Sequence, residues 1–68
     1  GRGQEMTETD ERILTQGAEA RAAGRTVFDN PFLRPEQMPA ATGDSIEDWQ
    51  RKHDEWDAGW KIEDAIRS

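Results

Sequence analysis

The sequence predicts an all-α protein in which two helices, at about residues 9–23 and 45–66, form a hairpin joined by a long, ordered, proline-containing loop. Three observations support this prediction. In the last third of the chain, tryptophans and other large side chains recur at spacings of three and four, the period of one face of an α-helix. A glycine follows the earlier helical segment, where helices commonly end. All three prolines lie between the two segments, where they forbid one continuous helix.

The predicted first helix has start and stop signals at both ends. Thr7 or Thr9 can cap its N-terminus through a hydroxyl oxygen. Acidic residues in the first turn favour the positive end of the helix dipole, and they are Glu8, Asp10 and Glu11. Gly24, followed by Arg25, has the position of a C-terminal cap. These signals predict a helix that ends at about Ala23.

The apolar face of this first helix is narrow. Ile13 and Leu14 are its large apolar residues, and small residues continue the stripe at Gly17, Ala20 and Gly24. A glycine inside a helix costs about 1 kcal/mol relative to alanine, so Gly17 suggests that a bulky group packs against the backbone there. The tryptophans are the obvious candidates. The simpler alternative is that Gly17 is an incidental weak point in a fraying helix.

Prolines at every fourth position divide the predicted loop, residues 25–43. They are Pro31, Pro35 and Pro39. Pro35 suits the first position of a single helical turn over residues 35–38. The loop also contains large apolar side chains, which we expect to anchor it to the helices in an ordered conformation: Val27, Phe28, Phe32, Leu33 and Met38.

The second helix is the clearest prediction. Asp44 and Ser45 both offer an N-cap, each with an acidic residue three positions later, which approximates a capping box. Each tryptophan in this helix can remove about 200 Å² from water, enough to anchor a small core. The spacings of three and four place five residues on one stripe, which is the predicted core face: Ile46, Trp49, His53, Trp56 and Trp60.

Two isoleucines of the second helix fall outside this stripe. At about 100° per residue, Ile62 and Ile66 lie near the angular position of Gly59. They form a second apolar patch, which could bind a partner or a second copy of the chain in a homodimer. Isolated exposed isoleucines are also common on monomeric proteins, so self-association is one of two interpretations.

The length and composition indicate one small domain. A chain of 68 residues buries only about 60% of the surface that it exposes when unfolded. We expect residues 1–5 to be left over from cloning, because Met6 opens a natural-looking start, and residues 6–68 to form the domain. The absence of cysteine favours a reducing, cytoplasmic setting. No apolar run reaches the ~20 residues of a membrane span, so we expect no membrane partner.

The sequence contains no motif that indicates an enzyme. Glycine-rich phosphate loops and the usual metal-binding spacings are absent, so we assign no catalytic, cofactor-binding or metal-binding residue and expect no cofactor. His53 is the only histidine and could act in acid–base catalysis, but a half-buried ring among tryptophans explains it better. Asp54 with Asp57, and Glu63 with Asp64, could attract a cation loosely. A solvated acidic face explains these pairs better.

The formal net charge of −6 bears on the choice of partner. A nucleic-acid-binding protein usually carries a basic stripe, so direct nucleic-acid binding is disfavoured. Asp48 with Lys52, and Asp57 with Lys61, are helix pairs at four-residue spacing that add only a few tenths of a kcal/mol to stability. A modest positive patch is expected near the first helix and the loop, from Arg12, Arg21, Arg25 and Arg34.

Three short motifs resemble one known family. They are Gly17-x-x-Ala20-x-x-x-Gly24-Arg25, then Asn30-Pro31-Phe32, then Trp56-x-x-Gly59-Trp60. In this order they resemble ribosome modulation factor and the related CrpP-type small bacterial proteins, over residues 13–65. The resemblance implies a two-helix fold with a long connection, in which these glycines and the tryptophans have packing roles. It also implies a regulatory role like that of ribosome modulation factor, which binds ribosomal RNA and promotes inactive ribosome dimers.

Two functions are compatible with these features. The leading hypothesis is a small acidic regulatory module that binds a protein or a ribonucleoprotein such as the ribosome, with candidate binding residues Arg21, Arg25, Phe32 and Arg34. The alternative is a phage- or mobile-element-type nucleic-acid mimic, in which carboxylates along residues 44–64 imitate phosphates and block a nucleic-acid-binding enzyme. Binding that weakens steeply with salt would favour the alternative.

Overall fold

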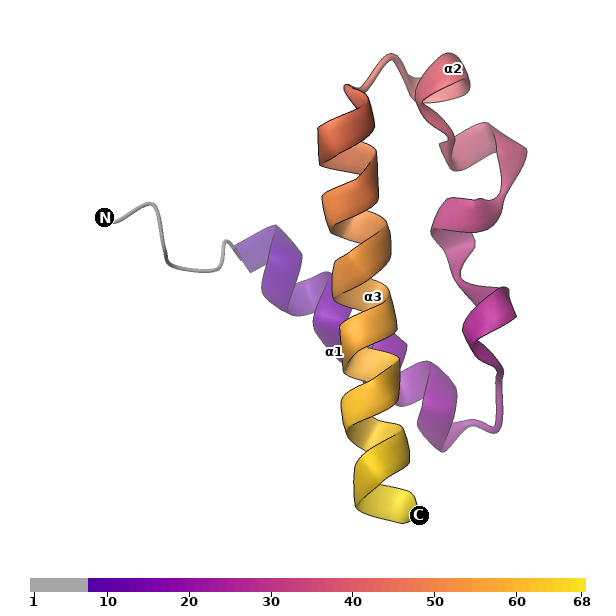
Figure 1. The fold of residues 1–68 in the computed structure, drawn as a ribbon, viewed down its shortest axis with the longest axis vertical. Helices are drawn as coiled ribbons and strands as arrows, with labels where there is room; N and C mark the ends of the chain where they lie inside the picture. Colours follow the sequence, from indigo (N-terminus) through magenta and orange to yellow (C-terminus); the bar gives the residue numbers. More distant parts are fainter. Residues whose placement is uncertain (1–7) are drawn as a thin grey trace.

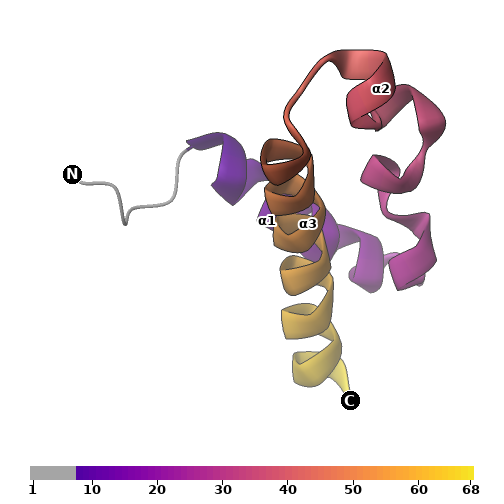
Figure 2. The ribbon, with the colours of Figure 1, turned by 45° about the horizontal axis from the view of Figure 1, so that its top comes forward.

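The computed structural model describes residues 8–68, and this part of the chain is helical with connecting turns. Helix α1 (Glu8–Ala22) crosses the long helix α3 (Ile46–Arg67), and the residues between them run along another side of α3 (Figure 1). Figure 2 shows the same arrangement with the start of α3 turned forward. The predicted all-α two-helix hairpin is confirmed. Residues 1–5 and the cap proposed at Thr7 lie outside the described residues.

The two main helices touch backbone to backbone where they cross. Gly17 of α1 and Gly59 of α3 are both buried at this point. A Cβ atom on Gly17 would overlap the carbonyl oxygen of Trp56, and one on Gly59 would overlap that of Leu14. The close approach expected at Gly17 is present, but the backbone of α3 fills the space there, and not a tryptophan side chain.

The buried core around this crossing is small. Ile13 is 6% exposed and Trp56 is 3% exposed, and no other large apolar side chain of residues 8–68 is buried. The rest of the tryptophan stripe on α3 is half-buried at Trp49, His53 and Trp60. Ile46 is 67% exposed, so its assignment to the core face is wrong. The reason is that α1 crosses α3 near Gly59 and leaves the first turn of α3 uncovered.

Helix α1 ends in a glycine cap. Gly24 has a left-handed backbone conformation, with φ of 86°. The Arg25 N–H donates to the carbonyl of Ala20 at 2.9 Å, and the Gly24 N–H donates to that of Arg21 at 3.0 Å, which together form a Schellman motif. A Cβ atom on Gly24 would meet nothing within 4 Å. Gly24 therefore allows the left-handed backbone conformation that ends α1. The packing role that the resemblance implied is not seen at Gly24.

Helix α3 begins after a serine cap. The Ser45 hydroxyl accepts a hydrogen bond from the N–H of Asp48 at 3.1 Å, so Ser45 holds the cap position that it shared with Asp44 in the prediction. The Asp44 carboxylate instead pairs with Lys52 at 3.2 Å. Because Asp44 occupies Lys52, the expected pair between Asp48 and Lys52 does not form, and Asp48 lies 3.7 Å from Arg51.

A series of short turns connects the helices, and we call residues 23–45 the connection. It contains three 3₁₀ turns and one short α-helix: η1 (Val27–Asp29), η2 (Pro31–Leu33), η3 (Pro35–Gln37) and α2 (Pro39–Thr42). A proline opens each of the last three, and η3 is the turn predicted for residues 35–38. The expected anchors Val27, Phe32 and Met38 are half-buried.

Two of the expected apolar anchors of the connection differ in how far they are exposed to solvent. Phe28 is 82% exposed, so its assignment as an anchor is wrong, whereas Leu33 is 38% exposed and is anchored only in part. Successive residues of a 3₁₀ turn are about 120° apart, because the turn has three residues. A residue that follows an inward-facing Val27 or Phe32 therefore points away from α3.

Candidate interaction surface

The half-buried tryptophans of α3 hold the connection in place through their indole N–H groups. Trp60 donates to the carbonyl oxygen of Arg25 at 2.8 Å, and Trp49 donates to the carbonyl oxygen of Phe32 at 2.8 Å. The two donors are separated by about three turns of α3. The connection is thus fixed along the middle of the helix and not at one point.

Asn30 is a buried residue to which sequence reasoning gave no role beyond a family motif. It is 2% exposed. Its side-chain amide donates to the carbonyl of His53 in α3 at 3.1 Å, and its side-chain oxygen accepts from the N–H of Phe32 at 2.9 Å. The Asn-Pro pair is a turn signal in the sequence, but no local pattern reveals the bond to His53.

Each indole donor is expected to make a separate contribution to stability. Replacing Trp49 or Trp60 by phenylalanine keeps an aromatic ring but removes the hydrogen bond to the connection. We expect each change to lower the free energy of unfolding by about 0.5–1.5 kcal/mol, the net value of one hydrogen bond. Urea unfolding followed by circular dichroism measures this loss. Phe28→Leu, at an exposed ring, is the control. Losses no larger than the control would mean that water replaces the missing donors.

Arg21, one of the predicted partner-binding residues, has its charge matched within the chain. Its Nε atom donates to Oδ1 of Asp64 at 2.7 Å, and its side chain is 27% exposed. The guanidinium carbon lies 5.7 Å from the centroid of the Trp60 ring, a cation–π distance. These contacts join the end of α1 to α3.

Two cations of the connection differ from all others in residues 8–68. Arg25 and Arg34 are exposed, and no carboxylate of this part of the chain lies within 4.0 Å of either guanidinium. Among the paired cations, Lys61 bonds to Asp57, and this hydrogen bond together with the negative charge of Asp57 raises the pKa of Lys61. The remaining cations are paired as Arg12–Glu8, Arg21–Asp64, Arg51–Asp10, Lys52–Asp44, Lys61–Asp57 and Arg67–Glu63. The positive patch predicted from four arginines thus reduces to two.

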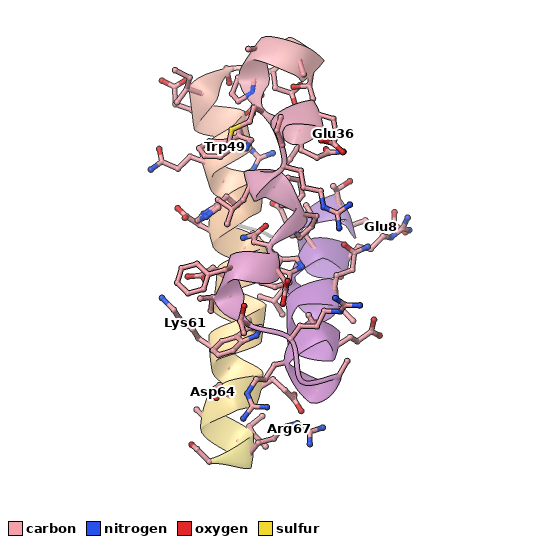
Figure 3. The ribbon with its side chains drawn as sticks, turned by 90° about the vertical axis from the view of Figure 1, so that its right-hand side faces the viewer. Glu8, Glu36, Trp49, Lys61, Asp64 and Arg67 are labelled. Carbon is pink, nitrogen blue, oxygen red and sulfur yellow. The ribbon has the colours of Figure 1, made fainter. Side chains whose placement is uncertain are left out.

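Exposed apolar side chains belong to the same segment as these two cations. We call Arg25, Phe28, Leu33 and Arg34 the candidate interaction surface. Figure 3 looks onto the connection, which lies in front of the helices in this view. Phe32, which was also a predicted binding residue, is half-buried, and its carbonyl accepts the Trp49 indole bond. Phe32 therefore positions the surface.

The geometry around His53 fits a structural role. Its Nδ1 atom lies 3.1 Å from Oδ1 of Asp54, and its ring centroid lies 5.6 Å from that of Trp49.

A shallow depression lies away from His53, on helix α1. It is lined by Glu8, Glu11, Arg12, Thr15, Gln16 and Glu19. No group of three or more potential metal ligands gathers within residues 8–68, and no helix among them is long and apolar enough to cross a membrane.

The second apolar patch is exposed. Ile62 is 52% exposed and Ile66 is 72% exposed, one turn apart on α3. Their exposure agrees with both interpretations, a homodimer contact and isolated surface isoleucines.

The residues that suggested a family occupy two places in the fold. Gly17 and Gly59 meet at the helix crossing, whereas Asn30 and Trp60 hold the connection on α3. No protein-family model matches the chain, and comparisons with curated proteins and with solved structures give no match either. The resemblance to ribosome modulation factor stays a hypothesis.

Proposed function

We propose that this chain is a small regulatory interaction module that binds a protein, free or within a ribonucleoprotein such as the ribosome, through the candidate interaction surface. One observation carries the proposal. The uncompensated cations Arg25 and Arg34 belong to the same segment as Phe28, which is 82% exposed. Arginine and aromatic side chains are the types that most often dominate binding energy at protein interfaces.

Local hydrogen bonds order this surface before any partner binds. The Thr26 hydroxyl accepts from the N–H of Phe28 at 3.2 Å, and the Asp29 carboxylate accepts from the N–H of Thr26 at 2.9 Å. This capping box fixes the turn that carries Phe28. A segment that is already ordered loses less conformational entropy on binding, so its contacts yield more affinity.

Charge favours a protein over a nucleic acid as the direct partner. A net charge of −6 repels a long polyanion at a distance. Isolated carboxylates on a protein surface can still pair with Arg25 and Arg34 at short range. The resemblance to ribosome modulation factor supports a ribosomal setting, in which the contact would be made to a ribosomal protein.

The nucleic-acid mimic receives less support. A mimic needs carboxylates that are available to the enzyme that it blocks. Most carboxylates of residues 44–64 have a cation of the same chain within 4.0 Å, namely Asp44, Asp48, Asp57, Glu63 and Asp64. These pairs reduce the local negative charge along α3.

Reversal of the two free cations tests the proposal. The double variant Arg25→Glu with Arg34→Glu is expected to weaken binding to a protein captured from a bacterial lysate by about 30-fold or more, since arginines central to an interface contribute about 2 kcal/mol or more. Phe28→Ala is expected to weaken the same binding by about tenfold. Calorimetry with the purified partner measures both affinities. Neither change should unfold the protein, because the three side chains are exposed.

The matched control changes the net charge equally at cations that are already paired. It is Arg12→Glu with Arg67→Glu, which removes the partners of Glu8 and Glu63. An equal loss of affinity in the control would assign the effect to net charge and contradict the proposed surface. Binding to protein-free ribosomal RNA that is as tight as binding to the captured complex would contradict a protein partner. Arg21→Glu is unsuitable here, because it also breaks a contact between α1 and α3.

A further inference from the structure

Glycines in the left-handed conformation stand near both ends of the connection. Gly24 has φ of 86° and Gly43 has φ of 82°, and a Cβ atom on either would meet nothing within 4 Å. The ion pair of Arg21 fixes the chain just before the first glycine, and the ion pair of Asp44 fixes it just after the second. Each glycine has no side chain to restrict its backbone and lies beside a fixed point, as hinge residues do, and opening at Gly24 also breaks the bond from the Arg25 N–H to the Ala20 carbonyl.

The connection and the helix crossing are stabilised by different interactions. Asn30 is the one buried residue of the connection, which is attached by the side-chain hydrogen bonds of Asn30, Trp49 and Trp60. The crossing instead buries Ile13 and Trp56 beside the glycine contact. Opening the connection breaks a few hydrogen bonds that water can replace and exposes side chains that are only half-buried, whereas opening the crossing exposes the fully buried Ile13 and Trp56.

We infer that residues 25–42 act as a strap that opens as one unit about its two flanking glycines while the crossing of α1 and α3 stays closed. Opening frees the indole groups of Trp49 and Trp60 and uncovers His53 between them. Segments with few buried apolar contacts open locally at a lower free energy than the packed core. The strap has these properties, and the crossing does not.

Asn30 is the latch of the strap. It is the only residue of the strap whose side chain donates to α3, and its bond to the His53 carbonyl lies between the two indole bonds. Its second bond, from the N–H of Phe32, keeps η2 folded. If the proposed function is right, the closed strap presents the candidate interaction surface, and opening withdraws it. The inference about opening itself does not depend on a partner.

Native-state hydrogen exchange on the whole chain, followed by NMR, tests the strap. The indole N–H protons of Trp49 and Trp60 donate from α3 to the strap, so they are expected to share one protection factor. We expect it to be at least about tenfold below that of crossing amides such as Gly59. A shared factor equal to that of the crossing would mean that the protein opens only globally. Two clearly different factors for the indoles would mean that the connection frays residue by residue. Either result would overturn the inference.

Asn30→Ser isolates the latch. A serine hydroxyl can still accept from the N–H of Phe32 but is too short to donate to the carbonyl of His53. We expect the indole protons of Trp49 and Trp60 to lose at least about a further fivefold of protection, with crossing amides changed by less than about twofold. Gln37→Ser removes an exposed amide with no side-chain hydrogen bond in residues 8–68, and should change neither group. Equal losses in both groups for Asn30→Ser, or none, would contradict a latch.

Discussion

Replacing Gly59 by alanine is expected to remove a large part of the stability of the protein. The new Cβ would overlap the carbonyl oxygen of Leu14 and lie 2.8 Å from its carbonyl carbon, so α1 and α3 would have to separate. No side-chain rotation relieves a clash with backbone, and we expect a cost of about 3 kcal/mol, the upper end for overpacking. A domain of 68 residues has roughly 3–10 kcal/mol of total stability. Gly17→Ala should behave alike, because its Cβ would overlap the carbonyl oxygen of Trp56.

The sign of this effect distinguishes packing from helix propensity. Alanine is favoured over glycine inside a helix by about 1 kcal/mol, so propensity alone predicts that both changes stabilise the protein. Packing at the crossing predicts strong destabilisation. Urea unfolding followed by circular dichroism at 222 nm decides between them. Gly43→Ala is the control, because it has open space and should cost only about 1 kcal/mol for its positive φ. A rise in stability for Gly59→Ala would contradict the crossing.

Sequence periodicity predicts helices and their faces, but it does not predict where two helices cross. The caps and spacings were sufficient for helices near residues 9–23 and 45–66, and the structure has Glu8–Ala22 and Ile46–Arg67. The same spacing put Ile46 on the core face, although it is 67% exposed. A periodic stripe extends along the whole helix, whereas a crossing partner covers only part of it. The contact between Gly59 and Leu14 depends on the crossing angle, which no local pattern contains.

The sequence predicts the segment that contains the candidate interaction surface, but it does not predict which residues of that segment are exposed. The sequence placed the partner-binding residues around the end of the first helix and the loop, and Arg25 and Arg34 are exposed there. Arg21 differs because it pairs with Asp64, a residue that is distant in sequence and near only after the helices cross. The exposure of Phe28 follows from the tight geometry of a 3₁₀ turn. An α-helical or extended reading of the loop could not distinguish it from Val27.

Trp56→Ala is expected to cost about 3–5 kcal/mol, a large part of the total stability of the protein. Trp56 is 3% exposed and is the largest of the buried apolar side chains in residues 8–68, so its removal leaves a cavity at the helix crossing. Trp56→Phe retains part of the ring volume and should cost less than half as much. Urea or thermal unfolding followed by circular dichroism measures both losses. Phe28→Ala is the control at an exposed ring, and should change stability by less than about 0.5 kcal/mol.

The order of the tryptophan variants tests how stability is divided within the fold. Trp60 is only half-buried, so Trp60→Ala should destabilise the protein less than Trp56→Ala even though it also removes the bond to the Arg25 carbonyl. A large loss at Trp56 with smaller losses at Trp60 and Trp49 places the stability in the crossing of α1 and α3. A larger loss for Trp60→Ala than for Trp56→Ala would place most of the stability in the connection. The strap could not then open while the crossing stays closed, because the crossing would have too little stability of its own.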